Sequence, residues 1–229
     1  MLYDEAAVRA NLRNREGKRV FYLAQGDKLT PSARDLLTRE RIEVLPAEQA
    51  RPERFRLLNG GFLEEKPEHM TQLNRELLVR KDHPRIRFRG AVDTLESELL
   101  LCQLACPRWQ KELGELLELA RRLIRCDVLE EPLEMPDLCG LSPEELRSHS
   151  HFPQKYYGQP HFMPEHTDGA ALLQLNRCRC AVRETELAAV EAFCPREAPP
   201  AREDILQALN RMSSMVYILM LREKANHKC

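Results

Sequence analysis

Apolar side chains recur at helical spacing through the C-terminal part of this sequence, and this pattern most constrains the fold. The clearest case lies near the C-terminus, where eight apolar residues gather on one helical face: Ile205, Leu206, Leu209, Met212, Met215, Val216, Leu219 and Met220. Such spacing is typical of a helix that buries one face against a partner. This part of the chain is therefore expected to form packed helices.

Three more segments show the same period. One covers residues 86–103, a second runs from Trp109 to Leu123 after Pro107, and a third runs from about Gly169 to Phe193. The last helix is expected to start near Ala201. Four long helices over residues 85–229 predict an antiparallel bundle. The connection over 128–168 is rich in proline and histidine, and Ser142-Pro143 starts one short helix in it.

The N-terminal part has a different pattern. Residues 20–23 and 42–45 are predicted strands, and Thr30-Pro31 supplies an N-cap and first-turn proline for a helix through about Glu40. Residues 1–50 are thus expected to form a small βαβ-like unit. Residues 51–84 contain scattered prolines and glycines, which predict an irregular linker with a short helix around Leu73–Val79. The fold class is mainly α, with a small α/β N-terminal unit.

Charge and hydropathy exclude several function classes. The 229 residues include 35 Lys+Arg and 36 Asp+Glu, so the net charge is −1, which argues against an electrostatic nucleic-acid binder. No apolar run approaches the roughly 20 residues of a membrane span. The N-terminus lacks the apolar core of a signal peptide, so the eight cysteines are expected to be reduced thiols in the cytoplasm.

Glycine-rich phosphate loops are absent from the sequence, which has neither a Walker A motif nor G-x-G-x-x-G. Arg183 and Glu186 share a helix face, and Arg179 belongs to nearly the same face. Two interpretations are open: a solvated or structural ion pair, or an anion site in which Glu186 orients Arg183.

Other polar residues have equally open roles. Asn210, Ser213 and Tyr217 form one stripe of the last helix, where Asn210 is suited to a helix-to-helix hydrogen bond or to a ligand contact. Asp93 is compatible with an ordinary surface acid. The histidines at 149, 151, 161 and 166 match no familiar closed metal site, and we interpret their segment as a ligand-gating loop.

The segments ILQALNRMSSMVYILM and AVRETELAAVEAF of this chain resemble the last two helices of corrinoid adenosyltransferases. Their ethanolamine-utilization type has a central segment similar to KPEHMTQLNRELLVRKDHPRIRFRGAVDTLESELL, and segments similar to LTPSARDLL and MPEHTDGAALL. The propanediol-utilization type shares a weaker form of these motifs. The resemblance covers nearly the whole chain, and it implies the helical-bundle fold of the cobalamin adenosyltransferases for residues 85–229.

The resemblance also implies an activity. Members transfer the 5′-deoxyadenosyl group of ATP to cob(I)alamin, and the product, adenosylcobalamin, is the coenzyme of ethanolamine ammonia-lyase. ATP, cobalamin and Mg²⁺ are the implied ligands. A flavin or reductase is the implied electron donor, and association with a bacterial microcompartment is a further expectation. Active sites of related bundles lie between subunits, which implies a homodimer or homotrimer.

Residue roles follow from the same resemblance. The implied catalytic residues are Arg183, Glu186 and Asp93, with Arg183 on the triphosphate and Glu186 holding it. The implied ATP-binding residues are Lys66, Thr71, Lys81, Arg183, Asn210 and Arg211. Arg211 is expected to support the nucleotide or to pair with Asp93.

The corrinoid needs an apolar wall that excludes water from the cobalt. We assign this wall to aromatic and sulfur-containing residues of the connection, namely Phe152, Tyr156, Tyr157, Phe162 and Met163. Some ethanolamine-type members carry a His and Cys metal cluster before the KP segment. No cysteine precedes Cys102 here, so no protein-held metal site is expected.

Two alternatives from other classes remain. The chain could be a non-catalytic corrinoid carrier or scaffold of the ethanolamine-utilization machinery, or a generic four-helix ligand-binding protein. Arg183→Ala separates these from an enzyme, because only an enzyme would lose adenosylation.

Overall fold

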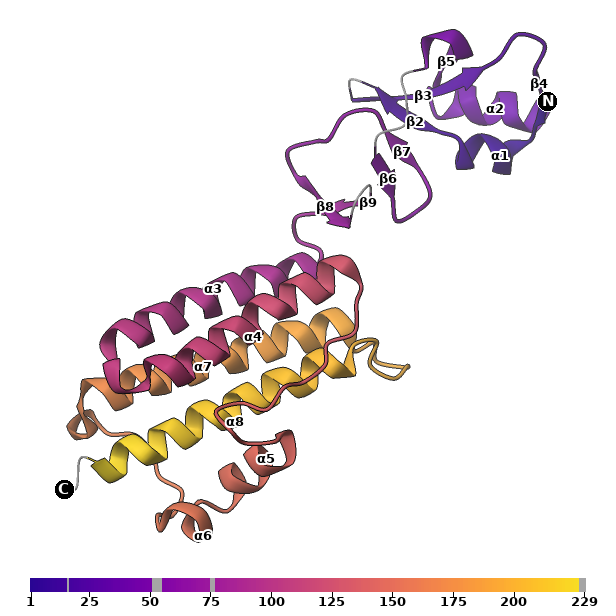
Figure 1. Cartoon of the computed structure of the whole chain (residues 1–229). Helices are drawn as coiled ribbons and strands as arrows, with labels where there is room; N and C mark the ends of the chain where they lie inside the picture. Colours follow the sequence, from indigo (N-terminus) through magenta and orange to yellow (C-terminus); the bar gives the residue numbers. More distant parts are fainter. Residues whose placement is uncertain (16, 51–54, 75–76, 227–229) are drawn as a thin grey trace. The chain divides into compact units, whose positions relative to one another are not determined.

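The computed structural model describes residues 1–15, 17–50, 55–74 and 77–226 of the 229-residue chain. The chain divides into two compact units, Met1–His83 and Pro84–Cys229. Short strands dominate the first unit and long helices dominate the second (Figure 1). The expected start of the helical region at residue 85 lies one residue from this division.

The first unit begins with the predicted βαβ arrangement. Strands β3 (Lys18–Leu23) and β5 (Glu43–Pro46) pair in parallel, with helix α2 (Pro31–Arg39) between them in the sequence. The Thr30 hydroxyl accepts a hydrogen bond from the Ala33 N–H at 3.3 Å, so the predicted N-cap is confirmed. The remaining elements of this part are β1 (Leu2–Tyr3), α1 (Glu5–Ala10), β2 (Arg13–Arg15), β4 (Lys28–Leu29) and η1 (Ala47–Gln49).

The segment 51–84, expected to be an irregular linker, contains strands within its described residues. Four strands follow: β6 (Phe55–Leu57), β7 (Phe62–Leu63), β8 (Met70–Asn74) and β9 (Leu77–Arg80). They extend the sheet of the first 50 residues in the order β5-β3-β2-β7-β6-β9-β8. Strands β2, β3 and β5 therefore share one sheet with the strands of residues 55–80, whereas β1 and β4 pair separately, and all of them belong to one unit.

The prediction of a short helix around Leu73–Val79 is wrong. Strands β8 and β9 pair antiparallel there, with Thr71 opposite Val79. A short apolar run fits both a helical and a strand period, and pairing to neighbouring strands satisfies the backbone groups that an isolated turn of helix would leave free. Residues 75–76 lie outside the described residues.

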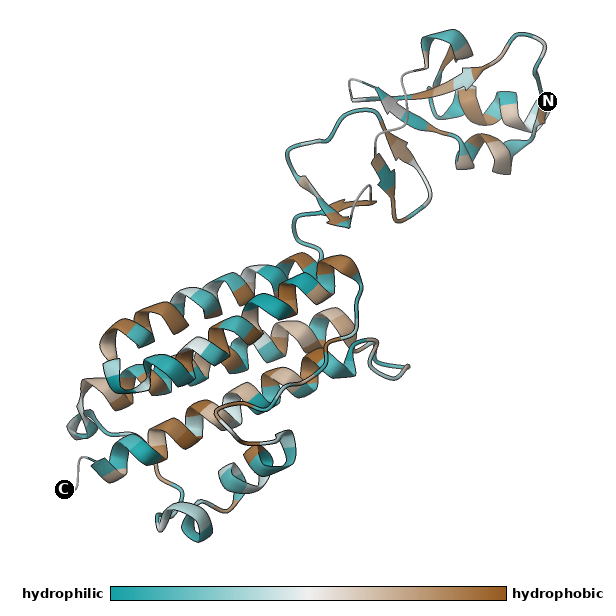
Figure 2. Ribbon diagram, viewed as in Figure 1, coloured by the Kyte–Doolittle hydropathy of each residue, from teal (hydrophilic) through white to brown (hydrophobic). Residues whose placement is uncertain are grey.

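The four long helices predicted for the second unit are all present. They are α3 (Pro84–Ala105), α4 (Gln110–Leu129), α7 (Gly169–Phe193) and α8 (Glu203–Asn226), with η2 (Pro107–Trp109) before α4. They lie side by side in Figure 1, and their apolar positions are brown in Figure 2. One buried cluster joins them, with Phe88 and Phe193 in edge contact at 5.3 Å between ring centroids. Within the described residues, none of the helices is long and apolar enough to cross a membrane.

Between α4 and α7 lies the predicted connection. It contains α5 (Pro143–His151), α6 (Pro153–Tyr157) and η3 (His166–Asp168). The Ser142 hydroxyl accepts from the Glu145 N–H at 3.2 Å, and a Glu145 carboxylate oxygen accepts from the Ser142 N–H at 2.8 Å. This capping box explains why α5 begins where the Ser-Pro pair predicts.

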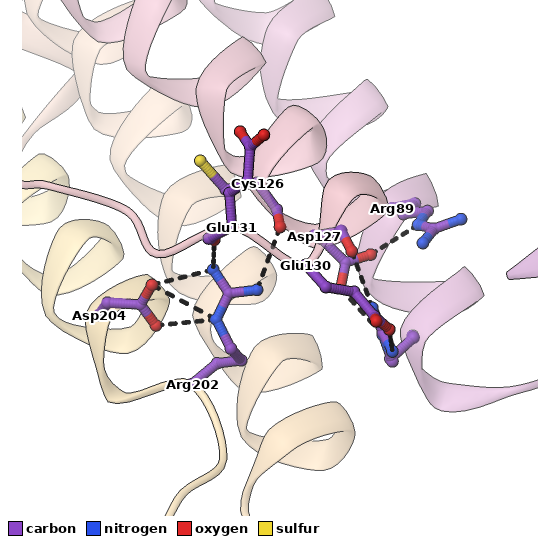
Figure 3. A network of polar contacts seen from close by, with 8 residues as sticks. Arg89, Cys126, Asp127, Glu130, Glu131, Arg202 and Asp204 are labelled. Atoms are coloured by element: carbon purple, nitrogen blue, oxygen red, sulfur yellow. Dashed lines mark hydrogen bonds and ion pairs between the residues drawn. The ribbon is translucent and has the colours of Figure 1, made fainter. Parts of the chain in front are cut away.

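Two polar clusters fix the ends of these helices. Asp127 of α4 is fully buried, and its two carboxylate oxygens accept from Nε of Arg85 at 2.9 Å and Nε of Arg89 at 2.7 Å. Next to it, the Arg202 guanidinium binds the Asp204 carboxylate at 2.9 Å (Figure 3). Arg202 also donates to the backbone carbonyls of Cys126 and Glu131, so the end of α4 is tied to the start of α8.

Candidate active site

A cavity of about 690 Å³ lies in the helical unit, formed by α7, α8, the end of α5 and residues 159–168, which we call the strap. Its lining combines cationic, amide, hydroxyl and apolar groups. The lining residues are Ser150, His151, His161, Phe162, Met163, Arg179, Arg183, Glu186, Asn210, Ser213, Ser214 and Tyr217. We call it the α7–α8 cavity.

Helix α7 contributes Arg179, Arg183 and Glu186 to this lining. The spacing of four and three residues places these side chains on one face of the helix. Val182 and Ala189 of the same helix are buried in the core, which fixes the rotation of α7. The polar stripe recognised in the sequence therefore faces the cavity.

The two arginines make the cavity suited to an anion. Within the described residues, neither guanidinium has an ion pair with a carboxylate, and Nε of Arg179 is buried with no hydrogen-bond partner. Burial lowers the pKa of the Arg179 guanidinium below its usual value, and the positive charge of Arg183 lowers it further. Two like charges one turn apart are destabilising until an anion bridges them.

Asn210 and Glu186 lie opposite each other in the cavity. Nδ2 of Asn210 on α8 donates to Oε1 of Glu186 on α7 at 3.3 Å. The helix-to-helix hydrogen bond considered for Asn210 is thus confirmed, and the same side chain lines the cavity. Glu186 bonds to Asn210, and within the described residues no hydrogen bond or ion pair joins it to Arg183.

Arg211 supports Asn210 from behind. Its terminal nitrogen donates to Oδ1 of Asn210 at 2.9 Å, which fixes the orientation of the amide. Burial and the nearby charge of Arg147 on α5 lower the pKa of the Arg211 guanidinium. Within the described chain it makes no pair with Asp93, which is exposed on α3.

The other side of the cavity is aromatic. The Tyr217 hydroxyl lies 3.0 Å from Nδ1 of His161, and the Phe162 ring stacks on Tyr217 at 6.0 Å between centroids. Met163 is exposed at the edge of the cavity. A cationic half and an apolar half therefore face one space.

Only two of the five residues expected to form the corrinoid wall line this cavity, namely Phe162 and Met163. Phe152 is 61% exposed and lines a separate cavity of about 400 Å³ beside α5. Tyr156 stacks on His149, and the Tyr157 hydroxyl contacts Nδ1 of His149 at 2.9 Å. These last contacts stabilise α5 and α6 rather than shaping the α7–α8 cavity.

The remaining expected ATP residues belong to the first unit. Lys66 is exposed between β7 and β8, Thr71 is half-buried in β8, and Lys81 follows β9 and donates its backbone N–H to the His69 carbonyl at 3.0 Å. Arg183, Glu186 and Asn210 belong to the second unit. The structure thus places the expected ATP residues in two units.

Neither the histidines nor the cysteines gather into a metal site in the part of the chain that the structure describes, where no three His, Cys, Asp or Glu side chains form a suitable group. His151 and His161 line the cavity instead. The seven described cysteines are free thiols. Cys178 is buried and Cys180 exposed, so the pair lies on different helix faces.

Arg179, His161 and Tyr217 are among the lining residues that had no assigned ligand role from the sequence. A signal existed for two of them, because Arg179 precedes Arg183 by one turn and Tyr217 continues the Asn210 stripe. For His161 there was no signal in the sequence beyond its place in a histidine-rich segment, because its contact with Tyr217 depends on how the strap packs on α8.

Comparison with known proteins identifies the family of this chain. The cobalamin adenosyltransferase family matches residues 62–223. The corrinoid adenosyltransferase EutT of Salmonella typhimurium is 32% identical over 97% of this chain and 92% of its own length. EutT of Escherichia coli K12 is 33% identical over 95% of this chain and 90% of its own length. The chain therefore belongs to the cobalamin adenosyltransferase family, and it is of the EutT type.

Proposed function

We propose that this protein transfers the 5′-deoxyadenosyl group of ATP to cob(I)alamin and that the adenosylcobalamin formed serves ethanolamine ammonia-lyase. One observation carries the proposal beyond family membership. Arg179 and Arg183, without carboxylate partners in the described chain, face the same cavity as the apolar Phe162 and Tyr217. A polyphosphate fits the first pair, and a corrinoid face fits the second.

The reaction is a nucleophilic displacement at carbon. The cobalt(I) electron pair forms a bond to the ribose C5′ as the C5′–O5′ bond breaks, and that bond pair leaves with the triphosphate. Cobalt(I) is so strong a nucleophile that general acid–base catalysis adds little. The protein therefore contributes orientation of the two substrates and stabilisation of charge on the leaving group.

Arg183 and Arg179 supply that charge stabilisation. Their guanidinium groups would bind phosphate oxygens in the forked geometry that arginine favours. Asn210 would hold the nucleotide, with its amide fixed by Glu186 and Arg211. Mg²⁺ is commonly held by phosphates with one or two carboxylates. Glu186 is the carboxylate in the described lining that suits this role, and the ion would reduce the charge of the polyphosphate.

The apolar half has a different task. Removing water and the lower axial ligand from cobalt(II) makes its reduction easier, which needs a wall without competing ligands. Phe162, Met163 and the Tyr217 ring would face the corrinoid. Phe152, Tyr156 and Tyr157 belong to the same proposed binding region, and their contacts favour a supporting role for the last two.

Several parts of the proposal extend beyond this cavity. Lys66, Thr71 and Lys81 of the first unit are proposed to contact the phosphates, and Asp93 to complete the site. Because Asp93 is exposed, we propose that it pairs with an arginine of another subunit in a homodimer or homotrimer. The four long helices are proposed to form the antiparallel bundle of the family. A flavin or reductase would deliver the electron.

The proposal is tested by anaerobic incubation with ATP, Mg²⁺ and chemically reduced cobalamin. The expected result is a corrinoid with the absorption spectrum of adenosylcobalamin that is converted to aquocobalamin by light. A corrinoid carrier would bind cobalamin and leave it unalkylated. That result would reject the transferase and support the scaffold function.

A further inference from the structure

Tyr217 contacts both halves of the α7–α8 cavity. Its side chain is 7% exposed, and the guanidinium carbon of Arg179 lies 5.0 Å from the centroid of its ring. The His161 ring lies 5.8 Å away at 15°, and the Phe162 ring 6.0 Å away at 23°. One buried ring therefore joins the cationic residue on α7 to two residues of the strap.

The Tyr217 hydroxyl is hydrogen-bonded to the strap through His161. Nε2 of His161 lies 3.3 Å from the His151 carbonyl, which only accepts, so the neutral ring carries its proton on Nε2. Nδ1 then accepts from the Tyr217 hydroxyl at 3.0 Å. The Phe162 ring, next in the sequence, stacks on the Tyr217 ring at 6.0 Å between centroids. The position of residues 161–162 thus depends on where this ring lies.

Arg179 is the weakly restrained member of this group. Its contact with the Tyr217 ring is attractive, whereas the charge of Arg183 one turn away is repulsive, and its Nε has no hydrogen-bond partner in the described structure. An anion between the two arginines would remove the repulsion. It would also hold the Arg179 guanidinium against the ring.

We propose that Tyr217 couples the two substrate subsites: an anion bound to Arg179 and Arg183 restrains the ring, and the ring places His161 and Phe162 against the corrinoid. The inference rests on the proposed function for the identity of the two ligands. Bound ATP then raises the affinity for corrinoid, and by thermodynamic linkage bound corrinoid raises the affinity for ATP by the same factor.

A purely structural role is the competing explanation, because other contacts also hold the strap. Lys224 pairs with Asp168 at 3.0 Å, and Nε2 of Gln159 donates to the Leu221 carbonyl at 3.1 Å. These contacts lie at the two ends of the strap. If they alone position it, changing Tyr217 would lower stability without altering the effect of one ligand on the other.

The test measures the dissociation constant of cob(II)alamin anaerobically, with and without saturating ATP and Mg²⁺. Cobalt(II) does not undergo the transfer, so binding is separated from turnover. For the wild type, ATP is expected to strengthen cob(II)alamin binding by a factor within the usual range for coupled sites, about 5- to 150-fold. Tyr217→Phe keeps the ring beside Arg179 and removes the hydroxyl bond to His161 of the strap. It should lose most of this factor while binding ATP alone within about threefold of the wild type.

Arg179→Met provides the other arm of a double-mutant cycle. It should also abolish the coupling, and the double variant should lose no more than either single variant. Tyr3→Leu is the matched aromatic control, because Tyr3 packs on Phe21 in the first unit at 5.2 Å between ring centroids. It should keep the full coupling. His161→Leu removes the same hydrogen bond from the strap side and serves if Tyr217→Phe folds poorly.

Each outcome bears on one claim. Wild-type coupling that persists in Tyr217→Phe and His161→Leu overturns the inference and leaves the proposed function standing. A wild type that binds both ligands independently also overturns it. A wild type that binds neither ATP nor cob(II)alamin overturns the proposed function itself, and the inference with it.

Discussion

Asn210 of α8 donates a hydrogen bond from Nδ2 to Oε1 of Glu186 on α7 at 3.3 Å, and both side chains line the same cavity. Arg211, the next residue, donates to the other end of the Asn210 amide at 2.9 Å. The amide is therefore held at both ends. The Asn210 amide thus has a fixed orientation before any ligand binds.

Asn210→Ala should lower kcat/KM for ATP by about 10- to 100-fold, since hydrogen bonds to charged groups contribute about 1.5–3 kcal/mol. Steady-state kinetics with ATP varied at saturating cob(I)alamin measures the effect. Asn210→Asp is the isosteric control, because it places a second carboxylate against Glu186 and should be no more active than the alanine variant. Wild-type activity of Asn210→Asp would show that the amide donor has no role.

The buried Asp127 carboxylate should be the most sensitive polar position for stability. Asp127→Ala leaves Arg85 and Arg89, each less than one-fifth exposed, without the carboxylate between them. Removing one partner of a buried pair costs about 3–5 kcal/mol of unfolding free energy. Urea unfolding followed by circular dichroism measures the loss.

A surface pair provides the comparison for Asp127. Arg87 and Glu191 form an ion pair at 2.8 Å with side chains 60% and 47% exposed, so Glu191→Ala should change stability by about 0.5 kcal/mol or less. Equal losses in the two variants would show that burial of the Asp127 network contributes nothing to stability.

Long periodic segments were predictable from sequence because their pattern repeats over many turns. All four long helices and the Thr30 and Ser142 caps followed from local spacing and cap chemistry. The strands β8 and β9 did not, because short apolar runs fit two periods and only pairing between strands decides between them.

In the candidate site, too, some features follow from local sequence pattern and others do not. Arg183, Glu186 and Asn210 lie on helices whose rotation the sequence pattern already fixes, so their convergence was foreseeable. The contact of His161 with Tyr217 joins residues 56 positions apart through a connection without periodicity. Nothing local specifies such a contact, and it required the three-dimensional structure.

The Arg202–Asp204 pair predicts how stability depends on pH. Burial alone would raise the pKa of Asp204, but hydrogen bonds from Arg202 and from the Leu133 N–H lower it below its usual value. A depressed folded-state pKa gives stability that is present above the unfolded value, about 3.9, and is lost as the pH falls through the folded value.

Asp204→Asn should therefore unfold at lower urea than the wild type at neutral pH, and the difference should shrink as the pH falls below about 4. Urea midpoints measured from pH 7 to pH 3 test this. A difference that stays constant over the whole range would contradict the assigned ion pair.

Cysteine reactivity should follow burial on the helices. The hydrogen bond with Cys106 lowers the pKa of the Cys102 thiol. Contact with Cys178 and burial raise this pKa by more, so that the result is a raised pKa of about 12. Cys180, exposed on α7, should be alkylated by iodoacetamide at pH 8, whereas Cys102 and Cys178 should react only after unfolding. Peptide mass spectrometry with and without urea measures this, and rapid labelling of native Cys102 would contradict the packing of α3 on α7.

The most direct test of the account compares single-turnover formation of light-sensitive adenosylcobalamin by the wild type, Arg183→Ala and Arg177→Ala. Arg177 lies on the same helix but is paired with Glu98 at 2.6 Å, outside the cavity lining, so it controls for loss of a charge on α7. The account predicts that the wild type and Arg177→Ala form product at similar rates. For Arg183→Ala it predicts a rate that is lower by at least about 100-fold. Equal rates for Arg183→Ala and the wild type would contradict the claim that this cavity binds the polyphosphate.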